Sequence, residues 1–286
     1  MRGPLLGAHV SISGGVVKAP ERAAGLFMNA FQIFTKNSNQ WAAKPIGSED
    51  AAAFREAVRR GGFKRLIAHT DYLINPASAN DVTAARSVES LRQEIERCQF
   101  LGIDMLVMHP GSHGGTGQQE GIRKLGAALG KVLGDAGRVT ILLETTAGQG
   151  NGIGNTFEQL AEIVEKSGAG RHRIGICYDT CHTFAAGYDI RTRDAYERTM
   201  ESFKRVMGIE RLRAFHLNDS KKGLGSRVDR HQHIGWGEMG LDPFRLIMND
   251  PRFHDIPKII ETPKEGNPEV YDRINLDTLL GLIDSE

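Results

Sequence analysis

Short runs of apolar residues recur along the chain, separated by longer stretches in which apolar residues have a helical spacing. Several of the short runs are continuous in Val, Ile and Leu, which is typical of parallel strands covered on both faces. The predicted strands are Leu5–Val10, Ala30–Phe34, Leu66–His69, Met105–His109, Val139–Glu144, Ile174–Asp179, Leu212–His216 and Lys258–Glu261.

The stretches between the strands are long enough for helices. The clearest are Ser48–Arg60, Asp81–Leu101 and Asn155–Lys166, the last with Asn155 as its N-cap. Eight alternations of strand and helix predict an α/β fold, a right-handed (β/α)8 TIM barrel. A chain of 286 residues is an ordinary length for such a barrel, and no linker divides it, so we expect a single domain over residues 1–286.

Composition narrows the class of protein further. Hydrophobic residues make up 40% of the chain and charged residues 25%, as in a globular protein with a sizeable core. The formal net charge of +1 does not by itself indicate a nucleic-acid partner. No stretch has the length or signature of a signal peptide or a membrane span, so we expect a cytoplasmic protein without a membrane partner. We expect Cys98, Cys177 and Cys181 to be reduced, the last two as buried packing residues.

Two predicted loops depart from the short connections of the rest. Residues Gly111–Gly117 are rich in Gly, and Asn218–Glu238 is long and rich in Gly, Lys, Arg and His. Long loops in compact domains are usually functional or disordered. The second loop carries several side chains that can bind metal, which favours a functional role.

Six consecutive predicted strands end in a histidine or an acidic residue. In a TIM barrel the carboxyl ends of the strands meet at one mouth, where active sites lie. One such histidine is usually a hydrogen-bonded structural residue, and one such acid is often a helix cap. These structural interpretations would have to hold at all six equivalent strand ends, which is improbable for the set as a whole. Carboxylates buried together also need cations nearby. The strand-end residues are His69, His109, Glu144, Asp179, His216 and Glu261.

Three further donors lie in the loops that follow, namely His182, Asp229 and His231. Five imidazoles and four carboxylates suit Zn²⁺ better than Mg²⁺, which prefers oxygen ligands and retains water. The number of donors exceeds what one ion can bind. The sequence therefore predicts a cluster of two or three metal ions.

Motifs around these residues resemble the endonuclease IV family of AP endonucleases, in order and over nearly the whole chain. The most specific of them is Gly225-Ser-Arg-Val-Asp-Arg-His231. The other matching segments are Gly7–Ser11, Phe34–Asn37, His69–Asn75, His109–His113, Glu144–Gly150, Asp179–His182, Ala185–Asp189 and His216–Asp219.

The resemblance implies a site of three zinc ions and divides the nine donors among them. One ion is expected on His69, His109 and Glu144. The second is expected on Glu144, which bridges, with Asp179, His216 and Glu261. The third is expected on His182, Asp229 and His231.

The implied activity is hydrolysis of the phosphodiester bond 5′ to an abasic site in double-stranded DNA. The expected products are a 3′-hydroxyl and a 5′-deoxyribose phosphate, and the same site is expected to remove 3′ blocking groups. Glu144 and Glu261 are the expected catalytic residues, and the protein is expected to act as a monomer.

The loops after the strands are expected to form a DNA-binding face. Lys36, Arg227 and Arg230 would contact the phosphate backbone, with Asn37 and Asn39 beside them. By the resemblance, Tyr72 and Leu73 enter the minor groove as wedges at the lesion. Family members often carry Arg where Asn39 stands, so DNA affinity or lesion preference is expected to differ here.

Two other functions fit parts of the pattern. A two-metal sugar isomerase or epimerase on the same barrel would use Glu, Asp, His and Glu on strand ends, but it leaves His69, His109, His182 and the Asp229/His231 pair unexplained. A non-catalytic protein that binds DNA damage would be expected to have lost ligands, and none of the nine is missing.

Overall fold

The strands close into a barrel. The computed structural model describes residues 3–134, 137–170 and 172–284. Within them, eight parallel strands form one sheet in the order β1-β10-β7-β6-β5-β4-β3-β2. The two end strands meet because His9 and Gln32 form a parallel bridge and the Val10 N–H donates to the Gln32 carbonyl at 2.8 Å. This confirms the predicted TIM barrel. The strands are β1 (Leu6–Ala8), β2 (Ala30–Phe34), β3 (Arg65–His69), β4 (Met105–Met108), β5 (Thr140–Glu144), β6 (Ile174–Asp179), β7 (Leu212–His216) and β10 (Lys258–Ile260).

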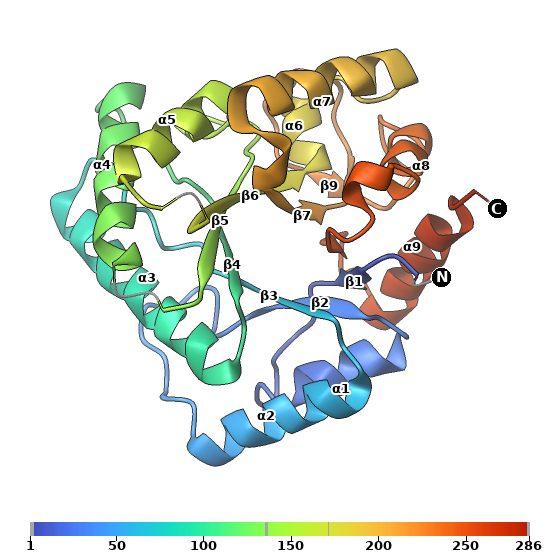
Figure 1. Ribbon diagram of the computed structural model, residues 1–286, viewed down its shortest axis with the longest axis horizontal. Coiled ribbons are helices and arrows are strands. Elements are labelled where there is room, and N and C mark those ends of the chain that lie inside the picture. Colours follow the sequence, from blue (N-terminus) through green and yellow to red (C-terminus); the bar gives the residue numbers. More distant parts are fainter. Residues whose placement is uncertain (1–2, 135–136, 171, 285–286) are drawn as a thin grey trace.

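Helices surround this ring of strands, and the first strand, β1, lies beside the last helix, α9 (Figure 1). None of the described helices combines the length and apolar character that crossing a bilayer requires. The helices are α1 (Lys18–Gly25), α2 (Ser48–Gly61), α3 (Asp81–Leu101), α4 (Gln118–Leu133), α5 (Phe157–Ser167), α6 (Thr180–Ala186), α7 (Arg193–Met207), α8 (Asp242–Met248) and α9 (Pro268–Gly281), with 3-10 turns at Ile209–Arg211 and Pro251–Phe253.

The predicted strands and helices agree with the observed ones to within one or two residues at each end. One predicted cap was wrong. Helix α5 begins at Phe157, and its N-cap is Thr156, not Asn155. The Thr156 backbone is extended, with φ −124° and ψ 153°, and its hydroxyl accepts a hydrogen bond from the Gln159 N–H at 3.2 Å, as an N-cap requires.

The side chains inside the barrel form two layers. Successive residues of a strand point to opposite faces, so residues two positions apart point the same way. The lower layer is apolar and fully buried, and it consists of Ala30, Ile67, Val107, Leu142, Cys177, Ala214 and Ile259. Two residues further along each strand stands a polar side chain, and these residues are Gln32, His69, His109, Glu144, Asp179, His216 and Glu261. The apolar layer therefore lies directly beneath the predicted metal site and separates it from the other end of the barrel.

Strand β1 contributes Gly7 to the lower layer and His9 to the upper one. A Cβ at position 7 would lie 1.8 Å from the Ala30 carbonyl oxygen, so only glycine fits between β1 and β2. The cysteines Cys98, Cys177 and Cys181, all among the described residues, are buried and unpaired. The burial of Cys177 and Cys181 confirms their predicted role as packing residues.

We expect Gly7→Ala to lower the free energy of unfolding by about 1–3 kcal/mol or more. The added methyl group must push β1 and β2 apart where the barrel closes. Thermal and denaturant unfolding measure the loss. The matched control is Gly25→Ala, because a Cβ at Gly25 meets no atom within 4 Å. Equal stability of the two variants would contradict the close approach.

Candidate metal centre

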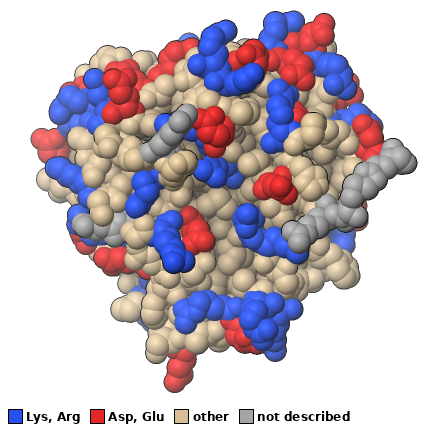
Figure 2. Space-filling view, in the orientation of Figure 1, with Lys and Arg blue, Asp and Glu red and all other residues tan. Residues whose placement is uncertain are grey.

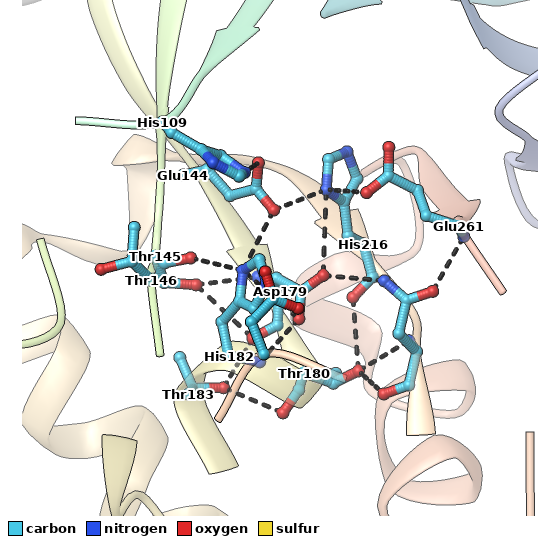
Figure 3. Close-up of polar contacts among 12 residues, drawn as sticks. His109, Glu144, Thr145, Thr146, Asp179, Thr180, His182, Thr183, His216 and Glu261 are labelled. Carbon is cyan, nitrogen blue, oxygen red and sulfur yellow. Dashed lines mark hydrogen bonds and ion pairs between the residues drawn. The ribbon is translucent and has the colours of Figure 1, made fainter. Parts of the chain in front are cut away.

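Glu144 lies at the centre of the polar layer and is fully buried. Its Oε2 lies 3.0 Å from the Nε2 atoms of both His69 and His109. Its Oε1 lies 3.0 Å from His216 Nδ1 and 3.3 Å from His182 Nδ1. Figure 3 shows several of these contacts converging on the one carboxylate. The two oxygens of Glu144 therefore face different groups of imidazoles.

A second group forms on the opposite side of Glu144. His216 Nδ1 lies 3.1 Å from Glu261 Oε2 and 4.0 Å from Asp179 Oδ2. One ligand atom from each of Glu144, Asp179, His216 and Glu261 lies within 4.8 Å of the others. The same holds for His69, His109 and Glu144, so both expected sets of donors come together.

The third group is His182, Asp229 and His231. The two Nε2 atoms lie 3.4 Å apart, and Asp229 oxygens lie 3.2 Å from His182 Nε2 and 3.5 Å from His231 Nε2. His182 is placed here because Asp179 caps α6: the His182 N–H donates to Asp179 Oδ1 at 2.7 Å. The Asp179 carboxylate thus belongs to the second group and also caps α6, the helix that carries His182 of the third group.

Asp229 and His231 reach the site from the long segment after β7. Two short antiparallel strands, β8 (Asp219–Ser220) and β9 (His231–Gln232), fold this segment back on itself. The buried Asp219 carboxylate accepts hydrogen bonds from the N–H groups of Ser220, Gly237 and Met239, at 2.7, 2.9 and 3.1 Å. These bonds hold the two ends of the segment together, so its donors are presented by a folded loop.

Four of the five imidazoles are oriented by an oxygen outside the cluster. The Nδ1–H groups of His69, His182 and His231 face the main-chain carbonyls of Thr70, Thr145 and Glu261 at 2.7, 2.9 and 3.1 Å. His216 Nε2 faces the Gln32 Oε1 atom at 2.8 Å. A carbonyl oxygen only accepts, so each of these nitrogens carries a proton, and in the neutral ring the other nitrogen offers a lone pair to the cluster.

Burial and mutual contact shift the pKa values of this site strongly. Burial alone would raise the pKa of Glu144, but the His216 and His109 imidazoles hold it well below its ordinary value. Burial likewise opposes the charged form of His182, yet Asp179 and Asp229 raise its pKa well above the ordinary value. The pKa of Asp229 falls to about 2, against the effect of burial, mainly because of His182. Protons on the imidazoles balance the carboxylates, and divalent cations can take the place of those protons.

Sequence reasoning missed residues that support the site. Gln32 donates to Glu261 Oε1 at 2.6 Å and accepts from His216, and His9 Nδ1 lies 3.1 Å from the same Glu261 oxygen. Asn218 donates to Asp179 Oδ2 at 2.7 Å and accepts from the Glu261 N–H at 2.8 Å. Gln32 carried a detectable signal, because it is the one polar residue inside the apolar run Ala30–Phe34.

Tyr72 stands at the mouth of the barrel and is 61% exposed. It lines two hollows, one of about 830 Å³ that reaches Glu261 and His231, and one of about 450 Å³ that reaches His69 and His109. The candidate metal centre is therefore open to solvent on both sides of the Tyr72 ring. Leu73 beside it is half-buried. The neighbouring loops carry the other expected DNA contacts at least partly exposed, namely Asn37, Asn39, Arg227 and Arg230.

The burial of Lys36 counts against its expected contact with DNA. Lys36 is only 5% exposed, and its ammonium group lies 2.5 Å from Asp71 Oδ2. It also donates to Ser90 Oγ at 2.9 Å and to the Trp41 carbonyl at 3.1 Å. Two hydrogen bonds and a close ion pair thus hold the ammonium group inside the protein.

Comparison with known proteins places this geometry among its relatives. Residues 20–279 match the family described as "Xylose isomerase-like TIM barrel". The chain is 51% identical over 280 residues to a protein of Geobacter sulfurreducens named "Probable endonuclease 4", covering 97% of this chain and 94% of that protein. A solved structure of endonuclease IV from Thermus thermophilus is 34% identical, with a TM-score of 0.85, and the match covers 97% of this chain and 99% of that one.

The sugar-enzyme alternative has a structural counterpart. A crystal structure of a D-tagatose 3-epimerase-like protein matches with a TM-score of 0.71 at 21% identity, over 97% of each chain. At this identity the likeness concerns the fold alone.

We expect added Zn²⁺ to raise the melting temperature of chelator-treated protein, and the increase to grow between about pH 5.5 and about pH 8. The raised pKa values of His109, His182 and His216 stabilise the metal-free protein below the ordinary histidine pKa. That contribution is lost as the pH rises through the raised values, while competition from protons for the metal weakens. A zinc effect that is constant or shrinks with pH would contradict this assignment of the imidazoles.

Proposed function

Because the chain belongs to the endonuclease IV family of AP endonucleases, we propose that it cuts double-stranded DNA on the 5′ side of an abasic site. The products would be a 3′-hydroxyl and a 5′-deoxyribose phosphate, and the same bond chemistry would remove 3′ blocking groups. We further propose that it acts as a single-domain monomer with three zinc ions.

The arrangement of the third group of donors carries the metal proposal. His182 and His231 each donate a hydrogen bond from Nδ1–H to a main-chain carbonyl. In the neutral rings the lone pairs are therefore on the Nε2 atoms, which lie 3.4 Å apart beside Asp229. Three electron-rich atoms so close repel unless a positive charge lies among them, which a proton on His182 supplies in the metal-free protein and a metal ion can supply in its place. With zinc bonds of about 2.0–2.1 Å, two ligand atoms of a tetrahedral site lie about 3.3–3.4 Å apart. The measured separations of 3.2, 3.4 and 3.5 Å fit such an ion.

The other donors fit two further ions. His69, His109 and Glu144 would hold one, and Glu144, Asp179, His216 and Glu261 would hold the next, with Glu144 shared between them. When bound, such ions lower the pKa of a water molecule and neutralise charge on a phosphate. The mix of imidazoles and carboxylates favours Zn²⁺ over Mg²⁺ or Ca²⁺.

The chain's own residues orient the reaction. Glu261 is fixed through Oε1 by Gln32 and His9, which leaves Oε2 directed at the cluster. The apolar layer beneath keeps water and protons from reaching the site through the barrel. Glu144 and Glu261 therefore act as catalytic residues by holding the reacting centre between two groups of imidazoles.

The loops around the mouth would bind the DNA. Tyr72 and Leu73 would enter the duplex at the lesion, and Arg227 and Arg230 would contact the phosphates; the exposure of Tyr72, Arg227 and Arg230 supports this. Away from the mouth, on the face that Figure 2 shows, Lys and Arg side chains are interspersed with Asp and Glu. Three zinc ions would add six positive charges to a chain of formal net charge +1, so the metal centre would supply much of the field that attracts phosphate.

We expect Glu261→Gln to lower the rate of incision of a duplex with one abasic site by at least about 10²–10³-fold, because the amide cannot supply the carboxylate charge. Cleavage is followed on a denaturing gel, and circular dichroism checks that the barrel is folded. Glu265→Gln, an exposed acid on the same loop, is the matched control and should keep full activity. Full activity of Glu261→Gln refutes the assigned site.

We expect His231→Ala to lower the zinc content measured by mass spectrometry by about one equivalent per chain and to slow incision, because His231 contributes to the third group and not to the first two. His233→Ala is the control: this neighbouring imidazole stacks on Tyr271 with ring centroids 4.7 Å apart, away from the cluster. Unchanged zinc content in His231→Ala would exclude the third ion.

A further inference from the structure

Two loops of the mouth are joined by a buried ion pair. Lys36 lies on the 35–41 loop after β2, and Asp71 lies on the 70–75 loop after β3. Their side chains are 3% and 0% exposed, and Lys36 Nζ lies 2.5 Å from Asp71 Oδ2. Asn37 and Asn39 are exposed on the first loop, and Tyr72 is exposed on the second.

Lys36 also fixes its own loop to the barrel wall. Its ammonium group donates to Ser90 on α3 and to the carbonyl of Trp41 at the far end of the loop. Glu94, also on α3, lies 3.9 Å from the same nitrogen and accepts a hydrogen bond from the Thr35 hydroxyl. The 35–41 loop is therefore held at both ends around one buried charge.

Asp71 shapes the second loop in the same way. Its Oδ1 accepts the N–H groups of Leu73 and Ile74 at 2.8 and 3.0 Å, which turns the chain at Tyr72. The Tyr72 N–H itself donates to the Ser38 carbonyl on the other loop at 3.2 Å. Each loop thus contacts the other through a side chain and through the backbone.

Separation of the two loops would leave the Asp71 carboxylate without the ammonium group that balances its charge, and it would leave Lys36 with its contacts to α3 and Trp41 alone. Breaking one buried ion pair in this way is strongly destabilising, so the pair favours joint movement of the two loops. Preorganised groups bind more tightly than mobile ones, because less conformational freedom is lost on binding.

We propose that the Lys36–Asp71 pair is a positioning device that sets Tyr72 relative to Asn37 and Asn39 before DNA binds. The proposal rests on the proposed activity toward abasic DNA. It gives Lys36 a role without any contact to the substrate.

The test uses the full-length zinc-loaded protein and the double variant Lys36→Met/Asp71→Asn, which removes both charges together. We expect KM for an abasic duplex to rise about tenfold or more, since loosened loops dock less precisely, with kcat within about twofold and zinc content unchanged. In a Trp236→Phe background Trp41 is the only tryptophan, and its emission should shift in the double variant without DNA.

Lys258→Met is the matched control. Lys258 is also buried, but it donates to the Phe253 and Ile256 carbonyls at the start of β10, at the end of that strand away from Glu261. It should lower stability without changing KM or the Trp41 emission. Asp71→Asn alone is the second variant if the double one does not fold; its Oδ1 keeps the bonds to Leu73 and Ile74, and KM should still rise.

The outcomes separate the two proposals. An unchanged KM and unchanged Trp41 emission in a folded Lys36–Asp71 variant overturns the positioning role, as does a matching rise of KM in Lys258→Met. Failure of the unaltered protein to cut abasic DNA overturns the proposed function instead, and the Trp41 emission still reports whether the pair positions its loop.

Discussion

The structure depends on positive charge among closely packed carboxylates and imidazoles. Glu144, Asp179 and His216 are fully buried, and they lie directly above an apolar layer in which the Cys177 thiol, beside His216, is the one side chain able to form a hydrogen bond. Anions at this density are not stable by themselves, because burial and mutual repulsion both oppose their ionisation. The barrel can hold these polar side chains because each of them stands two positions after a well-packed, inward-facing apolar residue of the same strand. The chemistry of the mouth and the stability of the core are thus supplied by alternate layers of the same strands.

The barrel and six strand-end donors were predictable because both follow from alternation along the strands. Continuous apolar runs predict the strands, and a fixed spacing of two residues assigns one side chain to each layer. The three donors outside the strands were different. Their place depends on the cap at Asp179 and on the closure of the 219–239 segment by Asp219, contacts that strand periodicity does not encode. For His182, Asp229 and His231, residue type and loop position indicated metal donors, and the family motifs supplied their grouping around one ion.

Lys36 shows where reasoning from sequence fails for physical reasons. A lysine in a polar loop is normally solvated, and nothing near position 36 indicates otherwise. Its partners Asp71 and Ser90 are distant in the chain, the serine by 54 positions, and only the folded barrel brings them together. The prediction of the α5 N-cap was wrong for a more local reason. Asn155 and Thr156 are both good capping residues, and the backbone conformation at Thr156 makes that residue the cap.

The oxygens that orient the imidazoles have an evolutionary consequence. Those facing His69, His182 and His231 belong to the main chain, so they persist whatever side chains occupy positions 70, 145 and 261. Gln32, which orients His216, is the exception, because its oxygen is lost with the side chain. Sequence drift among relatives should therefore be freer at position 70 than at position 32, although both supply the same kind of contact. Position 145 is constrained for another reason, because the Thr145 hydroxyl accepts a hydrogen bond from the Asp179 N–H at 2.9 Å.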